Sequence, residues 1–203
     1  MLADFSLPGL VSLLAAALAL MASPGPATLS VAATAAAYGF RGSLSYATGI
    51  NLGTILVLLA VALGASTLLH TLPGLALPVA VAASLYILYL AFRIATAPPL
   101  SDRADEAAPG LLPGLLLAIA NPKAYLAIGA VYSKAMLAPA SALADAALKC
   151  LILSAAIVLI HTAWALAGSV LTATLRHPRA SRLLNLLLAA ALVLVVVIDA
   201  LSW

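Results

Sequence analysis

The chain has 203 residues, of which 66% are hydrophobic and only 7% are charged, and its formal net charge is +3. Soluble domains carry about 25% charged residues, so this composition excludes a water-soluble protein and indicates an integral membrane protein surrounded by lipid bilayer. Nucleic acid is excluded as a partner, because the few basic residues form no cluster interleaved with aromatic residues.

About six apolar stretches are long enough to cross a bilayer as helices. In chain order they cover about residues 7–38, 44–69, 75–95, 111–136, 147–174 and 183–201. A polar, proline-containing linker, residues 96–110, separates the halves 1–95 and 111–203. With an odd number of spans in each half, the second half inserts upside down. We therefore predict an all-α membrane protein with six transmembrane helices in a 3+3 inverted repeat, forming one transporter domain over residues 1–203.

The first and fourth spans are each interrupted by proline near the middle. The first contains Ser23-Pro24-Gly25-Pro26, and the fourth contains Asn121-Pro122-Lys123. In lipid, a backbone group freed by proline is costly unless protein or cavity water satisfies it. Paired breaks at matching places in two halves are typical of a secondary transporter with its substrate site at the membrane midplane. The alternative is a pair of proline kinks absorbed by neighbouring helices.

Each break also predicts a helix start inside the membrane. Asn121 suits the N-cap position and Pro122 the first helical position. At the first break the helix restarts either after Ser23 or at Pro26, because a proline disfavours the helical conformation in the preceding Gly25. The two helix N-termini carry partial positive charge and unpaired N–H groups, which suit a carboxylate.

Lys123 follows the second break and lies too far from either end of its span to reach water easily. A lysine at this depth is by default a functional residue. We expect it to bind a substrate carboxylate or to take part in proton coupling. The structural alternative is a lysine that satisfies carbonyl groups freed by the break.

Further polar residues are placed to line the same cavity. Thr28 and Ser30 follow the first break, and Asn51 lies on one face of the second span. Asn51 either contacts substrate or bonds across helices. Gly49 and Gly53 form a small-xxx-small seam, which suits internal packing or a homo-oligomer contact equally well.

His161, near the middle of the fifth span, is a candidate for proton coupling, since histidine titrates near physiological pH; the alternative is a packed, neutral residue. Asp145 and Lys149 are spaced to form a solvated ion pair at the end of this span. No acidic residue is predicted deep in the membrane, and Cys150 is the single cysteine. We therefore expect no metal site and no cofactor.

The basic residues set the expected orientation. Arginines concentrate in the odd-numbered loops, at Arg41, at Arg93 and Arg103, and in 176–182. The positive-inside rule places these loops in the cytoplasm and both termini outside.

The chain resembles the LysE/RhtB family of amino-acid exporters. The resemblance rests on the two proline motifs and on the segments 38–42, 48–53 and 121–124. It implies a bacterial inner-membrane exporter of amino acids or related small metabolites, driven by protons, with motif residues Pro24, Gly25, Pro26, Asn121, Pro122 and Lys123.

Two departures from the family pattern bear on this expectation. The segment 125–129 replaces a phenylalanine-rich stretch, and Asn51 stands near where exporters of basic amino acids carry an acid. A neutral amino acid is therefore favoured over a basic one. Two other classes stay open: a channel for a small solute or ion, and an intramembrane enzyme built on a Ser23–Lys123 pair.

Overall fold

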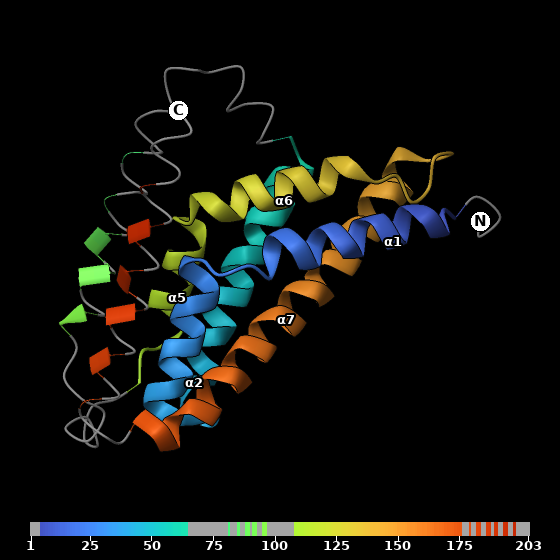
Figure 1. Cartoon of the computed structure of the whole chain (residues 1–203). Coiled ribbons are helices and arrows are strands. Elements are labelled where there is room, and N and C mark those ends of the chain that lie inside the picture. Colours follow the sequence, from blue (N-terminus) through green and yellow to red (C-terminus); the bar gives the residue numbers. More distant parts are fainter. Residues whose placement is uncertain are drawn as a thin grey trace.

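The structure, a computed structural model, describes residues 5–64 and 108–175, with isolated positions between 81 and 96 and between 179 and 197. Its continuous elements are all helical: α1 (Leu7–Ala16), η1 (Ala17–Met21), α2 (Pro26–Ala62), α5 (Leu111–Ile119), α6 (Pro122–Lys134) and α7 (Ala142–Leu175). The predicted spans 75–95 and 183–201 lie outside the described residues, apart from isolated helical positions. Figure 1 shows the arrangement of the elements.

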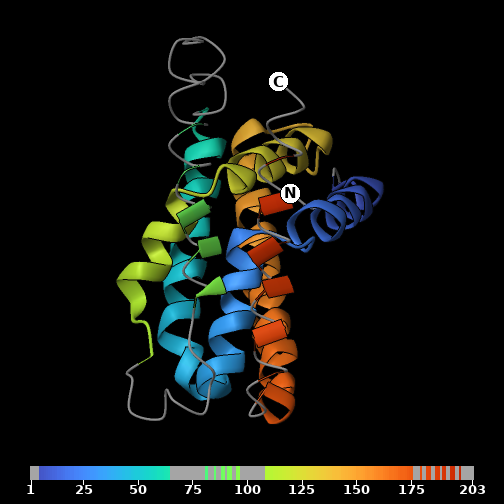
Figure 2. The ribbon, with the colours of Figure 1, turned by 60° about the vertical axis from the view of Figure 1, so that its left-hand side comes forward.

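Helix α2 reverses direction at Gly39, whose φ of 73° and ψ of 168° lie outside the helical region. A positive φ of this kind favours glycine, because it has no Cβ to clash with the backbone. Segments 26–38 and 40–62 consequently lie antiparallel and side by side (Figures 1 and 2). Val31, Ala35 and Ile50 pack in one buried cluster between them. The reversal falls at the loop predicted between the first and second spans.

Helix α5 packs directly on the seam formed by Gly49 and Gly53. A Cβ added at Gly49 would collide with the carbonyl oxygen of Leu111, and one added at Gly53 would lie 2.7 Å from Cβ of Ala118. Gly114 of α5 approaches the backbone of α2 in the same way. The small residues therefore serve packing within the chain, between its two halves.

The two proline breaks bend the helices that contain them. Helices α5 and α6 meet at an angle of 62°. Helices α1 and α6 lie side by side, across the direction of α2 and α5 (Figure 1). Leu13, Ile128 and Val131 pack together on this side of the break, in a second buried cluster. The breaks thus lie between two apolar clusters, one with α1 and α6 and one with α5, and both clusters also contain residues of α2 and α7.

By length and composition, two described helical stretches could span a membrane: Pro26–Ala62, which contains the reversal at Gly39, and Ala142–Val170. The bent pair α5–α6 gives a third candidate. The helix Leu7–Met21 is shorter. The long helix α7 runs past both segments of α2, and its Gly168 lies against the carbonyl group of Ala32.

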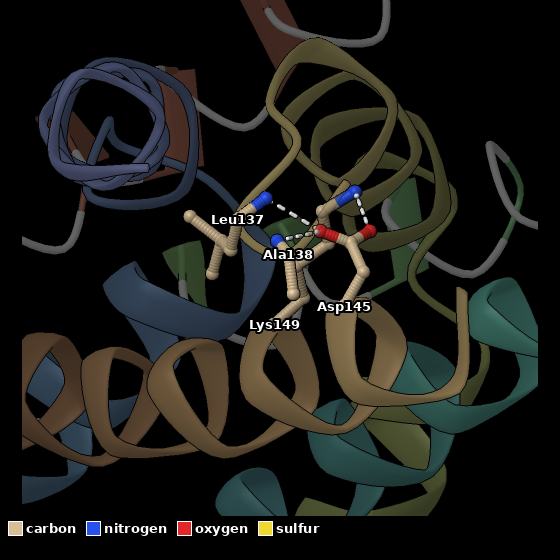
Figure 3. A network of polar contacts seen from close by, with 4 residues as sticks. All are labelled: Leu137, Ala138, Asp145 and Lys149. Atoms are coloured by element: carbon tan, nitrogen blue, oxygen red, sulfur yellow. Dashed lines mark hydrogen bonds and ion pairs between the residues drawn. The ribbon is translucent and has the colours of Figure 1, made fainter. Parts of the chain in front are cut away.

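The ion pair between Asp145 and Lys149 is buried, so the prediction of a solvated pair was wrong. The two residues are only 9% and 6% exposed, and Lys149 Nζ lies 2.7 Å from Asp145 Oδ2. Asp145 Oδ1 accepts hydrogen bonds from the backbone N–H groups of Leu137 and Ala138, at 2.5 and 3.1 Å (Figure 3). The carboxylate thereby connects the segment after α6 to the first turn of α7. The Lys149 ammonium also lies over the ring of Tyr132, at 4.8 Å from its centroid. Local spacing gave the pair but not the segment that covers it.

Candidate functional site

A partly open cavity lies where the two broken helices meet, with a volume of about 40 Å³ open to the centres of water-sized molecules. This is room for a few water molecules, since one water needs about 10–15 Å³ on the same measure. Its wall combines η1, the starts of α2 and α6, and the middle of α7. The lining residues are Leu20, Met21, Ser23, Gly25, Ala27, Thr28, Thr54, Asn121, Lys123, Ala124, Ala127, Ile128, Ile157, Ile160 and His161.

Lys123 reaches from the start of α6 into the first break. Its Nζ donates hydrogen bonds to the carbonyl oxygens of Ser23 and Pro24, at 2.7 and 2.6 Å, and to Oγ of Ser23 at 2.8 Å. In this conformation the ammonium therefore satisfies carbonyl groups that the first break frees, which was the structural alternative considered from the sequence. Lys123 is also the charged residue among those that line the cavity.

Other parts of the chain complete the first break. Trp164 of α7 donates its Nε1–H to the carbonyl oxygen of Ala22 at 3.1 Å. The Ser23 hydroxyl donates to the carbonyl oxygen of Leu20 at 2.7 Å, at the end of the π-helical turn η1. Such turns accompany breaks in helical hydrogen bonding. The backbone N–H of Gly25 donates to Oγ1 of Thr28 at 2.9 Å.

Gly25 leaves room for the path of the lysine. Its extended backbone, with φ of −173° and ψ of 179°, suits any residue. A Cβ at this position would lie 2.7 Å from Cδ and 2.8 Å from Nζ of Lys123. The absence of a side chain at Gly25 therefore lets Lys123 pass over the break. Helix α2 begins at Pro26, which settles the choice that the sequence left open.

The second break differs at its cap residue. Helix α6 begins at Pro122 with Asn121 as N-cap, as predicted, but the Asn121 side chain makes no capping hydrogen bond. Asn121 is 5% exposed, and its Oδ1 is buried without a hydrogen-bond partner among the described residues. Buried polar atoms of this kind are rare and costly in folded proteins.

His161 of α7 lines the cavity, and its ring forms a hydrogen bond with the side chain of Asn51, which does not line the cavity. The distance between His161 Nδ1 and Asn51 Oδ1 is 2.7 Å. An amide oxygen only accepts, so with Asn51 Oδ1 facing the ring it is Nδ1 that carries a proton and donates it. The Asn51 side chain thus bonds across helices.

The structure brings five of the predicted site residues to the cavity wall: Gly25, Thr28, Asn121, Lys123 and His161. The wall does not include Asn51 or Ser30, whose hydroxyl donates to the carbonyl oxygen of Ala27 at 2.9 Å. Pro24, Pro26 and Pro122 shape the breaks without lining the cavity. The roles assigned to these residues stay predictions.

Thr54, Ile157 and Ile160 line the cavity and were not predicted. Thr54 lies three residues after Asn51 and so shares its side of the second span, a spacing from which its position could have been found. The isoleucines resemble every other apolar residue of α7, and no local signal marks them.

In the part of the chain that the structure describes, no group of three or more His, Cys, Asp or Glu side chains is placed to hold a metal ion.

The amino-acid sequence of the chain is similar to those of a known protein family. A family model described as LysE type translocator matches residues 18–201. Cysteine/O-acetylserine efflux proteins of Salmonella choleraesuis and Salmonella typhimurium are 30% identical to this chain over 171 residues, which is 84% of this chain and 87% of theirs. The protein of the same name from Salmonella typhi has the same identity and coverage. No solved structure matches the chain significantly.

Proposed function

The chain belongs to the LysE type translocator family, and on this basis we propose that it exports small neutral amino acids or related metabolites across the bacterial inner membrane. A translocator moves its solute unchanged, so the enzyme alternative is set aside. The relatives are named for efflux of cysteine and O-acetylserine, which are small and neutral overall. These names direct the choice of test substrates for this chain.

The observation that carries the proposal is the cavity at the two breaks. The helices that begin at Pro26 and Pro122 both contribute their first turns to its wall, together with the Lys123 ammonium. The two helix N-termini and the ammonium favour a negatively charged group. The rest of the wall is mainly apolar, which suits a compact substrate and argues against a channel with a continuous polar lining.

The substrate carboxylate would meet Lys123 at the first break. There the ammonium donates to two backbone carbonyl oxygens and to the hydroxyl oxygen of Ser23. A carboxylate is a better acceptor than a hydroxyl, because charge-assisted hydrogen bonds are about twice as strong as neutral ones. The carboxylate can therefore replace Ser23 Oγ while the backbone bonds persist.

Alternating access would follow from movement of the broken helices relative to the long helix α7 around this cavity. Proton-motive force would drive export, with Lys123 or His161 carrying the proton. The Gly39 turn and the end of α7 lie at the same end of the molecule (Figures 1 and 2), and arginine-containing segments adjoin both in sequence. We assign this end to the cytoplasm and both termini to the outside.

Counterflow in proteoliposomes tests the function. Vesicles containing the protein are loaded with one unlabelled amino acid, and accumulation of the same labelled compound is followed for cysteine, O-acetylserine, serine, lysine and arginine. We expect accumulation with at least one neutral compound and none with lysine or arginine. Counterflow with the basic amino acids would contradict the assigned substrate class, and no counterflow at all would contradict the function.

The site is tested with Lys123→Met in the same assay. We expect counterflow to fall at least tenfold, since a hydrogen bond to a charged group contributes about 1.5–3 kcal/mol and 1.4 kcal/mol is a factor of ten. Lys134→Met is the matched control, because Lys134 is an exposed lysine in the last turn of the same helix. Folded Lys123→Met protein with full counterflow would show that substrate binds elsewhere.

A further inference from the structure

The carbonyl group of the Asn121 side chain is a hydrogen-bond acceptor that the described fold leaves unused. Oδ1 is buried and has no protein partner in the described part of the chain, although the residue caps a helix. The residue lines the cavity, only two positions before Lys123. A buried acceptor without a partner, on a residue that lines a polar cavity, indicates a ligand that supplies the missing donor.

The other polar side chains of the wall already have protein partners. Thr28 Oγ1 accepts from the backbone N–H of Gly25, and Thr54 Oγ1 donates to the carbonyl oxygen of Ile50 at 2.8 Å. Ser23 and His161 are engaged through Lys123 and Asn51. Asn121 therefore differs from its neighbours, because a ligand can bond to its carbonyl oxygen without replacing an existing hydrogen bond.

The charges at the second break favour an ammonium group as the donor. Helix α5 ends at Ile119, two residues before Asn121, and the carboxyl end of a helix carries partial negative charge. The positive end of the break is occupied by α6 and Lys123. Both signs of charge are thus presented within a few residues, which suits a ligand that carries a carboxylate and an ammonium on neighbouring atoms.

We propose that Asn121 Oδ1 accepts a hydrogen bond from the α-ammonium group of the substrate, so that the cavity selects α-amino acids over the corresponding carboxylic acids. The inference rests on the proposed function and deepens it. Lys123 holds the carboxylate, Asn121 holds the ammonium, and the side chain of the substrate meets the apolar part of the wall. Recognition of the ammonium needs no acidic residue, which agrees with a substrate of zero net charge.

The test compares two probes that differ in the ammonium group alone, reduced L-cysteine and 3-mercaptopropionate. Their dissociation constants are measured on purified protein in detergent, for the wild type, Asn121→Leu, Asn121→Asp and Ser133→Ala. Leucine has the shape of asparagine without its polar atoms, and aspartate keeps an acceptor oxygen in the same place. Ser133 is exposed on the same helix and serves as control.

We expect the wild type and Ser133→Ala to prefer cysteine by about tenfold to a hundredfold, the range that a hydrogen bond to a charged group supports. Asn121→Leu should abolish this preference by weakening cysteine alone. Asn121→Asp should keep or increase it. If Asn121→Leu does not fold, the aspartate variant decides: a preference below that of the wild type would overturn the inference.

Equal weakening of both probes in Asn121→Leu, or no weakening of either, would overturn the role of Asn121 and leave the exporter function standing, provided that the wild type shows counterflow. A wild type that binds neither probe and shows no counterflow with any amino acid would overturn both proposals.

Discussion

At the first break, polar groups from distant parts of the chain reach the backbone groups that proline frees. The Lys123 ammonium bonds two carbonyl oxygens, Trp164 bonds a third, and the Thr28 hydroxyl accepts from the N–H of Gly25. At the second break, the cap residue Asn121 keeps a buried oxygen without a partner among the described residues. The backbone groups of the first break thus have protein partners, whereas the second break keeps an unused acceptor.

This difference shows how two similar motifs can divide the tasks of a transport site. A completed break gives a rigid reference, because each group there has a fixed partner. A break with an unused acceptor stores an unfavourable energy that a ligand can relieve on binding. Substitutions should therefore change stability in opposite directions at the two breaks.

The largest effect is expected for Gly25→Val. The side chain would occupy the space of the Lys123 stem, and alanine would be milder because a flexible lysine can shift slightly. Loss of the three lysine bonds should lower the free energy of unfolding by about 3 kcal/mol, measured by denaturation in mixed micelles. Gly110→Val is the control, since Gly110 is also an extended N-cap residue and nothing lies within 4 Å of an added Cβ. Equal losses in the two variants would contradict the steric role of Gly25.

A smaller loss is expected for Thr28→Val, which keeps the shape of the side chain and removes its hydroxyl. The buried N–H of Gly25 would lose its acceptor, and the free energy of unfolding should fall by about 1–3 kcal/mol in the same assay. Thr34→Val is the matched control, because its hydroxyl only donates to the carbonyl oxygen of Ser30, one turn earlier in the helix. A loss in the control as large as in Thr28→Val would argue that the break is not held by this hydroxyl.

The smallest effect has the opposite sign. Asn121→Leu removes a buried oxygen that has no partner in the described structure, and no capping bond is lost with it. We expect the free energy of unfolding of the ligand-free protein to rise by about 1 kcal/mol. Destabilisation would mean that the Asn121 side chain has a structural role, and the comparison between the two breaks would fail.

The sequence predicted the features that depend on neighbouring residues. Both breaks, the helix start at Pro122 and the turn near Arg41 follow from proline and glycine chemistry. The start at Pro26 and the internal packing at Gly49 and Gly53 were each one of two alternatives that the sequence left open. The family was predicted from the same motifs and is confirmed by the match over residues 18–201.

The features that the sequence did not predict depend on contacts between distant segments. The residues near Lys123 do not indicate that its side chain reaches the other break. Asn121 is a residue type common at helix N-caps, so its lack of a capping hydrogen bond could not be predicted. Asp145 has the spacing of a surface ion pair, yet the segment after α6 covers it. In each case the partner is set by the packing of broken helices, which local patterns do not encode.

The bond between Lys123 and Ser23 also has a consequence for biosynthesis, since the two residues are 100 positions apart. At a synthesis rate of roughly 5–20 residues per second, the first break would wait about 5–20 s for its lysine after entering the membrane. During this interval its carbonyl groups need water, lipid head groups or an insertion factor as temporary partners. The amino-terminal half is therefore not a self-sufficient folding unit, and its break acquires its final form only when the second half arrives.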